Sequence, residues 1–501
     1  MSRPNIVLIM TDQHRRDTLG CYGARVCRTP ALDRLAASGT RFDAAFTPSA
    51  ICTPTRASLV TGVAPFRHKL LANFERNVGY REELGDEFAP FSALLARWGY
   101  DCHHVGKWHV GRKRGPADFG FTGEHFVGWG NPVDHPAYLR YLHERGLPGY
   151  QLRREIRGVF PNGEPGNLLA GILDGPTEST FEHFLADLAI EQILAAAHTG
   201  RPFFLALHVF GPHLPYCLPA EWYHRYDAKD VVLPASMAET FAGKPMVQRH
   251  YSQHWAVDSL GEKTWRELTA AYWGYVSMID AEIGRVLDRL DEVSDDSAVF
   301  FSADHGEFTG AHRLHDKGPA MYDDIYRIPM LARIPGGPAG NVAQGITTIT
   351  DLTATFADLA GAGVPDHYDG RSLVPLLRGE HPADWRPDFV GEFHGHHFPY
   401  PQRMLRTARH KLIINPADVN ELYDLELDPD ELRNVYESPA YQEIRLDLTR
   451  RLYAALRERG DNFYHWMTSM LDVGGKSYDA ALSSLDPDRS HRPAPEERSQ
   501  P

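Results

Sequence analysis

A cysteine, a proline and an arginine are spaced so that they could form a reactive centre at the start of a short helix. Residues 52–56 read Cys-Thr-Pro-Thr-Arg. Thr53 followed by Pro54 predicts a helix start, because the fixed φ of proline suits the first helical position, and Gly62 predicts its end. Cys52 would then lie just outside the amino end, where free N–H groups and the helix dipole stabilise negative charge. A buried structural cysteine would fit this segment as well.

Two acidic residues follow predicted strands. Residues 5–10 and 298–302 are continuous apolar runs, which is typical of strands buried on both faces of a sheet. Ligands of open α/β sheets gather at the carboxyl ends of the strands, so polar side chains there would meet the cysteine and form an oxygen-rich cation site. A cation there would neutralise charge on a transferring sulfuryl or phosphoryl group. Asp12 alone could equally be a helix cap. The predicted ligands are Asp12, Gln13, Cys52, Asp304 and His305.

The pattern Cys-x-Pro-x-Arg, followed by Ala-Ser-Leu and Thr-Gly, resembles the maturation motif of the formylglycine-dependent sulfatases of the alkaline-phosphatase-like superfamily. In that family a maturase oxidises the cysteine to the aldehyde Cα-formylglycine, whose hydrate is the nucleophile. The family also places an Asp-Asp or Asp-Gln pair and an Asp-Asn or Asp-His pair around one divalent cation, usually Ca²⁺. This chain has the Gln and His variants, and an imidazole ligand suits Mn²⁺ better than Ca²⁺. The resemblance extends from about Asn5 to about Arg457.

The resemblance assigns further residues that the 26 histidines of the composition would not single out. Gly-Lys-Trp-His-Val-Gly at 106–111 is similar to the Lys-x-His element that contacts the hydrate and the sulfate. His213, in Pro-His-Leu-Pro-Tyr, matches the His-x-Pro histidine, and Lys317, in His-Asp-Lys-Gly, matches the late lysine. Asn73 is a further predicted substrate contact. The candidates for binding sulfate oxygens and for protonating the departing alcohol are Arg56, Lys107, His109, His213 and Lys317.

Five other histidines lack such support and are predicted to be surface or pocket-rim residues. The segment 391–397, which contains three of them, could reach the mouth of the site. The five are His312, His315, His394, His396 and His397.

The mechanism that the resemblance implies has two stages. One hydroxyl of the hydrate, bound to the metal, attacks sulfur while His213 or Lys317 protonates the leaving alkoxide. The second hydroxyl, deprotonated with help from His109, then expels sulfate and regenerates the aldehyde. A phosphonate monoester or phosphodiester hydrolase of the same superfamily is the main alternative, which the Gly-Lys-Trp-His element disfavours. A protein that only binds sulfated ligands ranks last, because every nucleophile and metal residue is present.

Composition narrows the class of protein. A chain of 501 residues with 43% hydrophobic residues can bury a large core, and a net charge of −14 argues against nucleic acid or an anionic membrane as the main partner. Five cysteines without a Cys-x-x-Cys pair indicate a reduced, cytoplasmic protein without a disulfide scaffold. We find neither a signal peptide nor a transmembrane stretch. A homo-oligomer is compatible with the sequence. The sequence does not identify the alcohol half of the substrate.

The alternation of buried strands and helices predicts a doubly wound, mostly parallel α/β domain over residues 1–377, of the alkaline-phosphatase-like type. A small antiparallel sheet with a helix is predicted for 378–470, followed by a tail over 471–501 that is disordered from 486. Residues 111–176 are predicted to be irregular surface excursions. The other predicted strands are 100–106, 203–208, 406–415 and 421–425, and the predicted helices start near 30, 88, 178, 265 and 441.

Overall fold

The first strand of the chain divides its side chains between two hydrophobic cores. The computed structural model describes residues 3–74, 78–126, 132–416 and 418–469. In β1 (Asn5–Thr11), Val7 and Ile9 pack into one core, while Ile6, Leu8 and Met10 pack into the other. Because both faces of the strand are buried, its sequence is a continuous apolar run rather than an alternating one. The predicted tail over 471–501 lies outside the described residues.

β1 lies near the centre of an eight-stranded sheet. One strand, β10, runs antiparallel to both of its neighbours, and the other pairs in the sheet are parallel. This arrangement confirms the predicted mostly parallel α/β fold. The strands in spatial order are β11 (Asn341–Thr348), β2 (Thr40–Phe46), β10 (Met330–Arg333), β9 (Ser297–Ala303), β1, β7 (Phe203–His208), β3 (Asp101–Lys107) and β4 (His125–Phe126).

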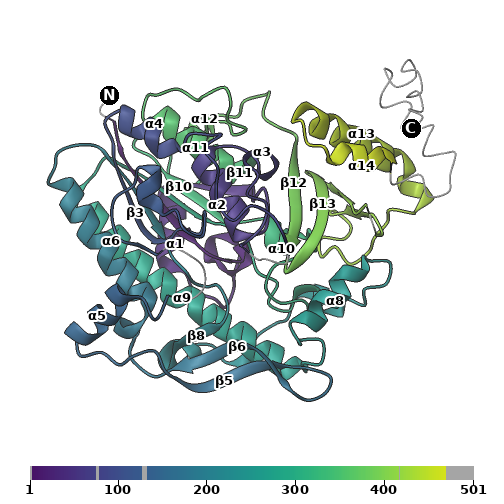
Figure 1. Cartoon of the computed structure of the whole chain (residues 1–501), viewed down its shortest axis with the longest axis horizontal. Coiled ribbons are helices and arrows are strands. Elements are labelled where there is room, and N and C mark those ends of the chain that lie inside the picture. The colour runs from purple at the N-terminus through teal and green to yellow at the C-terminus, as the bar shows by residue number, and fades with distance from the viewer. Residues whose placement is uncertain (1–2, 75–77, 127–131, 417, 470–501) are drawn as a thin grey trace, which may run out of the picture.

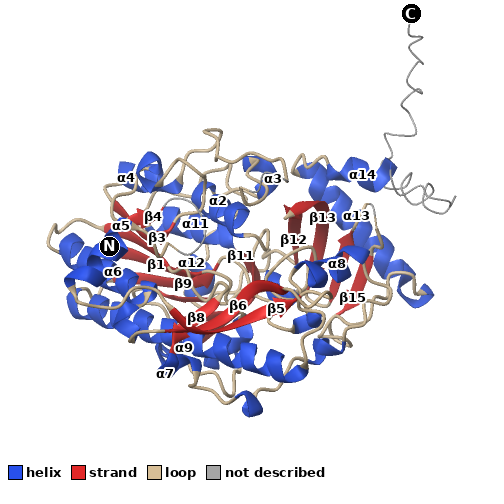
Figure 2. Cartoon of the chain, turned by 60° about the horizontal axis from the view of Figure 1, so that its bottom comes forward, coloured by secondary structure: helices blue, strands red, loops and turns tan. Residues whose placement is uncertain are grey.

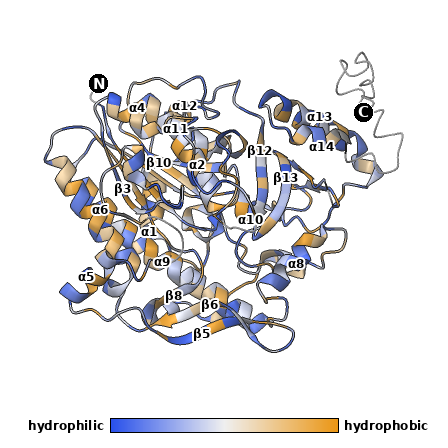
Figure 3. Cartoon of the chain, viewed as in Figure 1, coloured by the Kyte–Doolittle hydropathy of each residue, from blue (hydrophilic) through white to orange (hydrophobic). Residues whose placement is uncertain are grey.

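Helices cover both faces of this sheet (Figure 1). Hydrophobic residues, coloured orange in Figure 3, recur along the helices that pack on the sheet. The first face is covered by α1 (Pro30–Ser38), α6 (Phe181–Ala197) and α9 (Glu262–Val293). The second face is covered by α2 (Cys52–Thr61), α4 (Phe91–Arg97), α11 (Ile349–Leu359) and α12 (Val374–Leu377).

A second, three-stranded sheet corrects the prediction that residues 111–176 are irregular. It contains β5 (Leu152–Val159), β6 (Pro165–Leu173) and β8 (Tyr216–Pro219), and α5 (Pro136–Glu144) precedes it (Figure 2). β5 has four charged residues and is mostly exposed, so it carries no apolar run that could mark it in the sequence. β6 pairs parallel with β8, a contact between segments distant in sequence that local pattern does not reveal.

The C-terminal part forms the predicted small antiparallel sheet with helices beside it. The predicted strand over 406–415 contains the end of one strand, a turn at 408–409 and the whole of the next strand, and the strand over 388–396 was not predicted. The strands are β12 (Asp388–His396), β13 (Phe398–Thr407), β14 (His410–Ile414) and β15 (Glu421–Asp424). α13 (Gln442–Glu458) and α14 (Phe463–Ser469) pack against this sheet.

Four further helices belong to the fold. Among the residues that the structure describes, none of the helices combines the length and the hydropathy needed to span a bilayer. All five cysteines are free thiols, as expected for a chain without a disulfide scaffold. The four further helices are α3 (Pro65–His68), α7 (Ala220–Tyr223), α8 (Met246–His254) and α10 (Asp323–Tyr326).

Candidate active site

The carboxyl ends of two neighbouring strands bring two acidic residues to one point. β1 and β9 run parallel with Thr11 opposite Ala303, so Asp12 and Asp304 follow at adjacent positions on the same edge of the sheet. The backbone N–H of Gln13 donates to Oδ1 of Asp304 over 3.1 Å, which joins the two strand ends. Both carboxylates are buried. The fold therefore holds two negative charges close together, away from solvent.

The helix after β2 places Cys52 in its own first turn. α2 begins at Cys52 with Ile51 as the N-cap residue, so the prediction that Thr53 caps the helix and that Cys52 precedes it is wrong. Pro54 is the third helical residue, where its missing N–H would have had no partner within the helix. Gly62 ends the helix as predicted, in the left-handed conformation with a φ of 73°.

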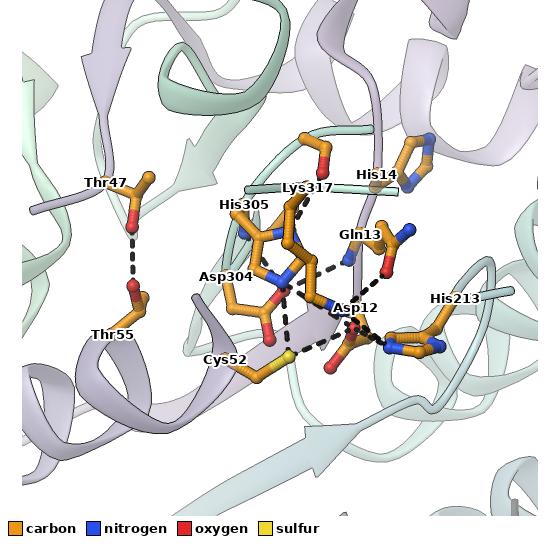
Figure 4. A network of polar contacts seen from close by, with 12 residues as sticks. Asp12, Gln13, His14, Thr47, Cys52, Thr55, His213, Asp304, His305 and Lys317 are labelled. Atoms are coloured by element: carbon orange, nitrogen blue, oxygen red, sulfur yellow. Dashed lines mark hydrogen bonds and ion pairs between the residues drawn. The ribbon is translucent and has the colours of Figure 1, made fainter. Parts of the chain in front are cut away.

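Cys52 points toward the two strand ends (Figure 4). Its Sγ lies 3.2 Å from Nε2 of His305 and 3.8 Å from Oδ1 of Asp12. One donor atom from each of Asp12, Cys52, Asp304 and His305 lies within 4.8 Å of the others, and all four residues are buried. Burial, and then the Asp12 carboxylate, raise the pKa of the Cys52 thiol to about 11. The unmodified thiol therefore stays protonated at neutral pH and is a weak nucleophile.

Arg56 binds both carboxylates at once. Its Nη2 donates to Oδ2 of Asp12 over 2.9 Å and its Nε donates to Oδ2 of Asp304 over 3.0 Å. A further N–H donates to the backbone carbonyl of Lys107 over 3.1 Å. The side chain is buried and is not among the described residues that line the cavity beside the site. Its contacts are those of a group that fixes the carboxylates, whereas the sequence suggested a donor to the substrate.

The strand β3 brings a lysine and a histidine to the same place. Nζ of Lys107 lies 2.8 Å from Oδ2 of Asp12. Nδ1 of His109 lies 3.4 Å from Oγ1 of Thr53, and the Phe74 ring meets the imidazole edge-on at 4.9 Å between centroids. Burial, and then the charge of Lys107, lower the pKa of His109 well below its ordinary value. Its imidazole is therefore neutral at neutral pH and can accept a proton.

His213 and Lys317 form a hydrogen-bonded pair on the other side of Asp12. Nδ1 of His213 lies 2.6 Å from the carbonyl oxygen of Leu214, and Nε2 lies 2.8 Å from Nζ of Lys317. These partners assign the ring proton to Nδ1, so Nε2 accepts from the ammonium group. Burial opposes the charge of Lys317, but the negative groups around it, first among them the carboxylate of Asp316 at 3.0 Å, together outweigh burial and raise the pKa. The transferable proton of the pair therefore lies on Lys317.

The Gln13 side chain is held at the same centre from two directions. Its Oε1 accepts from Nζ of Lys317 over 3.1 Å, and its Nε2 donates to Glu307. Glu307 also accepts the backbone N–H groups of Thr309 and Asp316. Burial, and then the Asp316 carboxylate, raise the pKa of Glu307 to about 7. We did not predict Glu307 or Asp316, and their only signal in the sequence is that they neighbour predicted residues.

Asn73 has a local structural contact as well as a place in the cavity wall. Its Oδ1 accepts the backbone N–H of Thr53 over 3.2 Å, so the amide caps an unpaired donor in the first turn of α2. It also lines the cavity next to Phe74. This residue therefore links the loop after α2 to the orientation of the Cys52 turn.

The five unassigned histidines divide into two groups. His312, His315 and His394 are buried and lie outside the cavity wall, which corrects the prediction of surface or rim positions. His396 and His397 do line the cavity, as expected for a segment that could reach the mouth of the site. His394 is buried because it lies on the buried strand β12, and His312 is buried beside the carboxylate of Glu239 at 3.2 Å.

A cavity of about 260 Å³ opens beside Cys52. The groups with positive or imidazole side chains face one part of it, and aromatic rings form much of the remaining wall. The polar residues of the wall next to the site are Asn73, Lys107, His109, His213, Asp316 and Lys317. An anionic group placed there would meet two ammonium groups and two imidazoles. These groups make the cavity locally favourable for an anion although the chain as a whole is negatively charged.

The donor set beside Cys52 fits a divalent cation. Carboxylates from Asp12 and Asp304 and the amide oxygen of Gln13 are hard oxygen ligands of the kind that Ca²⁺ takes, and the imidazole of His305 also suits Mn²⁺. Buried carboxylates side by side repel each other unless positive charge compensates them. Arg56 and Lys107 supply part of that charge, and a bound cation would supply more.

The fold and the site together define a class, an α/β protein with a cluster of ammonium and imidazole groups beside buried oxygen donors at the carboxyl ends of its strands. Comparison with known families gives the particular family. Residues 4–362 match the sulfatase family, and residues 310–458 match the family described as N-sulphoglucosamine sulphohydrolase, C-terminal. The chain belongs to the sulfatase family and is a sulfuric ester hydrolase by that membership, which confirms the resemblance found in its sequence.

Individual relatives cover nearly the whole chain. The uncharacterized sulfatase YidJ of Escherichia coli (strain K12) is 29% identical over 473 residues, 93% of this chain and 90% of the relative. The N-acetylglucosamine-6-O-sulfatase of Bacteroides thetaiotaomicron is 26% identical and covers 92% of this chain and 87% of its own length. Among solved structures, the phosphonate monoester hydrolase of Agrobacterium radiobacter superposes with a TM-score of 0.75 at 26% identity, over 91% of this chain and 96% of that one.

Proposed function

We propose that the protein hydrolyses sulfate esters with a formylglycine made from Cys52 and with one divalent cation. The observation that carries the proposal is the position of Cys52 Sγ. It lies within a buried cluster of two carboxylates and an imidazole, next to a cavity lined by Lys107 and Lys317. This position supports the proposal, because transfer of a sulfuryl group needs a nucleophile, a cation and donors for the sulfate group at one point.

Two groups would complete this centre. A formylglycine-generating maturase would convert Cys52 to an aldehyde, whose hydrate supplies a hydroxyl nucleophile. When bound, a divalent cation would act as a Lewis acid that favours the deprotonated nucleophile and neutralises charge on the sulfate. Asp12, Gln13, Asp304 and His305 would hold it. Ca²⁺ fits their oxygen-rich set, and Mn²⁺ is the alternative that the imidazole supports.

The remaining residues have separate tasks in this proposal. Lys107 and Lys317 bind the non-bridging sulfate oxygens and stabilise the charge that grows on them. The proton for the departing alkoxide comes from Nζ of Lys317, because Nε2 of His213 already accepts from that ammonium. The neutral imidazole of His109 accepts a proton from the nucleophile side. Arg56 and Asn73 are positioning residues, which orient the carboxylates and the first turn of α2.

Phosphonate monoester hydrolysis is the second candidate, because a structural relative with that activity is 26% identical over nearly the whole chain. The matured protein should be assayed with an aryl sulfate and with the matching aryl phosphonate monoester, beside the Cys52→Ala variant. We expect a higher kcat/KM for the sulfate, and no turnover by the variant. A higher kcat/KM for the phosphonate would favour the second candidate. Binding of sulfate esters without any turnover would instead favour a non-catalytic binder.

Chelation tests the cation. Removal of divalent ions from the matured protein should abolish turnover of the aryl sulfate, and adding back Ca²⁺ or Mn²⁺ separately should identify the ion that restores it. Full turnover after exhaustive chelation would contradict the proposed cation. The expected homo-oligomer and the cytoplasmic location remain predictions.

A further inference from the structure

The part of the cavity wall that the reaction does not use is aromatic. We call it the aromatic chamber and define it by Tyr150, Phe181, Phe210 and Tyr275, which all line the cavity. The rings of Phe181 and Phe210 meet edge to face, with 5.3 Å between centroids and 89° between planes. Nζ of Lys107 lies 5.7 Å from the centroid of Phe210. The chamber therefore adjoins the place where the sulfate group would bind.

One carboxylic acid faces this chamber. Glu182 lines the cavity and is only 6% exposed, and its Oε1 accepts the phenol proton of Tyr275 over 2.7 Å. It is the second residue of α6, whose N-cap is Thr180, and the backbone donors of the first helical turn favour a negative group there. Burial raises the pKa of Glu182, and the nearby Glu282 adds to the effect.

Among the residues that the structure describes, Glu182 has no positively charged partner. None of the ion pairs among the described residues includes it, and its only side-chain partner among them is the Tyr275 hydroxyl. Asp316, the other carboxylate of the cavity wall, has its ammonium partner in Lys317 at 3.0 Å. A buried carboxylate without a counter-charge is unfavourable, so the chamber is suited to a ligand that brings a positive charge.

We propose that the alcohol half of the substrate carries an ammonium group, preferably a quaternary one, which the aromatic chamber binds between Glu182 and the ring faces. This inference rests on the proposed sulfatase function, since the sulfate end of the same molecule would lie against Lys107 and Lys317. Aromatic faces attract cations, and cages of such rings bind quaternary ammonium groups. The cavity then matches a zwitterionic ester, with its positive side chains at the sulfate end and its unpaired carboxyl at the ammonium end.

Neutral alcohols match the chamber less well. An aryl group would fill the aromatic wall but would leave Glu182 without a counter-charge. A sugar needs several polar partners for its hydroxyl groups, whereas Tyr150, Phe181, Phe210 and Tyr275 present mainly ring surface. The combination of several rings with one carboxyl that has no positive partner among the described residues is therefore the feature that selects a cation.

The test compares two esters of equal shape in the matured, metal-loaded protein. One is trimethylammonioethyl sulfate, and the other is its neutral isostere, in which a quaternary carbon replaces the nitrogen. We expect kcat/KM to be about 10- to 100-fold higher for the ammonium ester, from the usual strength of buried cation–π and charge contacts. Glu182→Gln should lower this ratio about 10-fold. The matched control is Glu392→Gln, a buried glutamate outside the substrate cavity, which should leave the ratio unchanged.

The outcomes separate this inference from the proposed function. Equal or better turnover of the neutral isostere would overturn the ammonium proposal and leave the sulfatase function intact. Turnover of an aryl sulfate with neither alkyl ester accepted would overturn it in the same way. If no sulfate ester is hydrolysed, the proposed function itself fails. An unchanged ratio in Glu182→Gln would show that this carboxyl does not recognise the cation.

Discussion

Arg56 should be far more important to stability than an ordinary arginine of the surface. The Arg56→Ala change removes the guanidinium that binds Asp12 at 2.9 Å and Asp304 at 3.0 Å, in a site where all three side chains are buried. Breaking a buried ion pair by removing one partner costs about 3–5 kcal/mol. Lys107 still compensates Asp12, but Asp304 has no second ammonium or guanidinium partner among the described residues. We therefore expect the Arg56→Ala free energy of unfolding to fall by about 3–5 kcal/mol.

The matched control is Arg34→Ala, which removes an arginine from an exposed pair. Arg34 and Asp288 lie 2.6 Å apart with side chains 55% and 64% exposed, and pairs of this kind contribute about 0–1 kcal/mol. Both variants should be compared with the unaltered protein by equilibrium urea unfolding in the presence of a chelator, so that bound cations do not contribute. An equal loss of stability in the two variants would refute the idea that Arg56 holds the carboxylates in place.

Three further predictions follow from single contacts. Lys317→Ala should lower kcat about 10²- to 10³-fold. The loss should be larger for an alkyl sulfate than for a nitrophenyl sulfate, because a poor leaving group depends more on protonation. An equal loss for both esters would argue against Lys317 as the acid. Asn73→Ala should lower the free energy of unfolding by about 1 kcal/mol through the lost cap on α2 while changing KM less than about twofold, and a large rise in KM with unaltered stability would instead indicate a substrate contact. Burial raises the pKa of Asp280 to about 7, against the backbone N–H groups of Ala31 and Leu32 that favour its charge. The folded protein thus binds the Asp280 proton more tightly than the unfolded chain does. Between about pH 4 and 7 its free energy of unfolding should therefore fall as pH rises, by up to about 1.4 kcal/mol per pH unit relative to Asp280→Asn. Urea midpoints that run parallel for the two proteins across this range would contradict this prediction.

The central strands that position the site could be predicted from the sequence because they are buried on both faces. β1 and β9 are continuous apolar runs, and long helices such as α6 and α9 could be predicted because they contain many apolar residues. β5 and β6 could not be predicted from the sequence. β5 exposes charged side chains, and β6 completes its sheet by pairing with a strand that is distant in sequence. β12 was missed because its glycines and histidines, although buried, resemble a polar loop.

The residues of the site differ in how far the sequence alone could predict them. Asp12 and Asp304 follow from strand ends alone, because neighbouring parallel strands must deliver them to one edge. His213 and Lys317 depended on the resemblance to a family motif, since nothing in their local sequence distinguishes them from other histidines and lysines. Glu307 and Glu182 could not be found, because their significance lies in contacts with residues far away in the chain. The start of α2 was misplaced by local rules that favour proline at the first helical position.

The central claim is that the nucleophile is made from Cys52. The protein should be produced together with a formylglycine-generating maturase, digested with trypsin, and the peptide covering residues 42–56 analysed by mass spectrometry beside an assay with an aryl sulfate. We predict that this peptide carries an aldehyde in place of the thiol and that turnover increases in proportion to the converted fraction. Full turnover by a sample in which the peptide retains its unmodified cysteine would contradict the account.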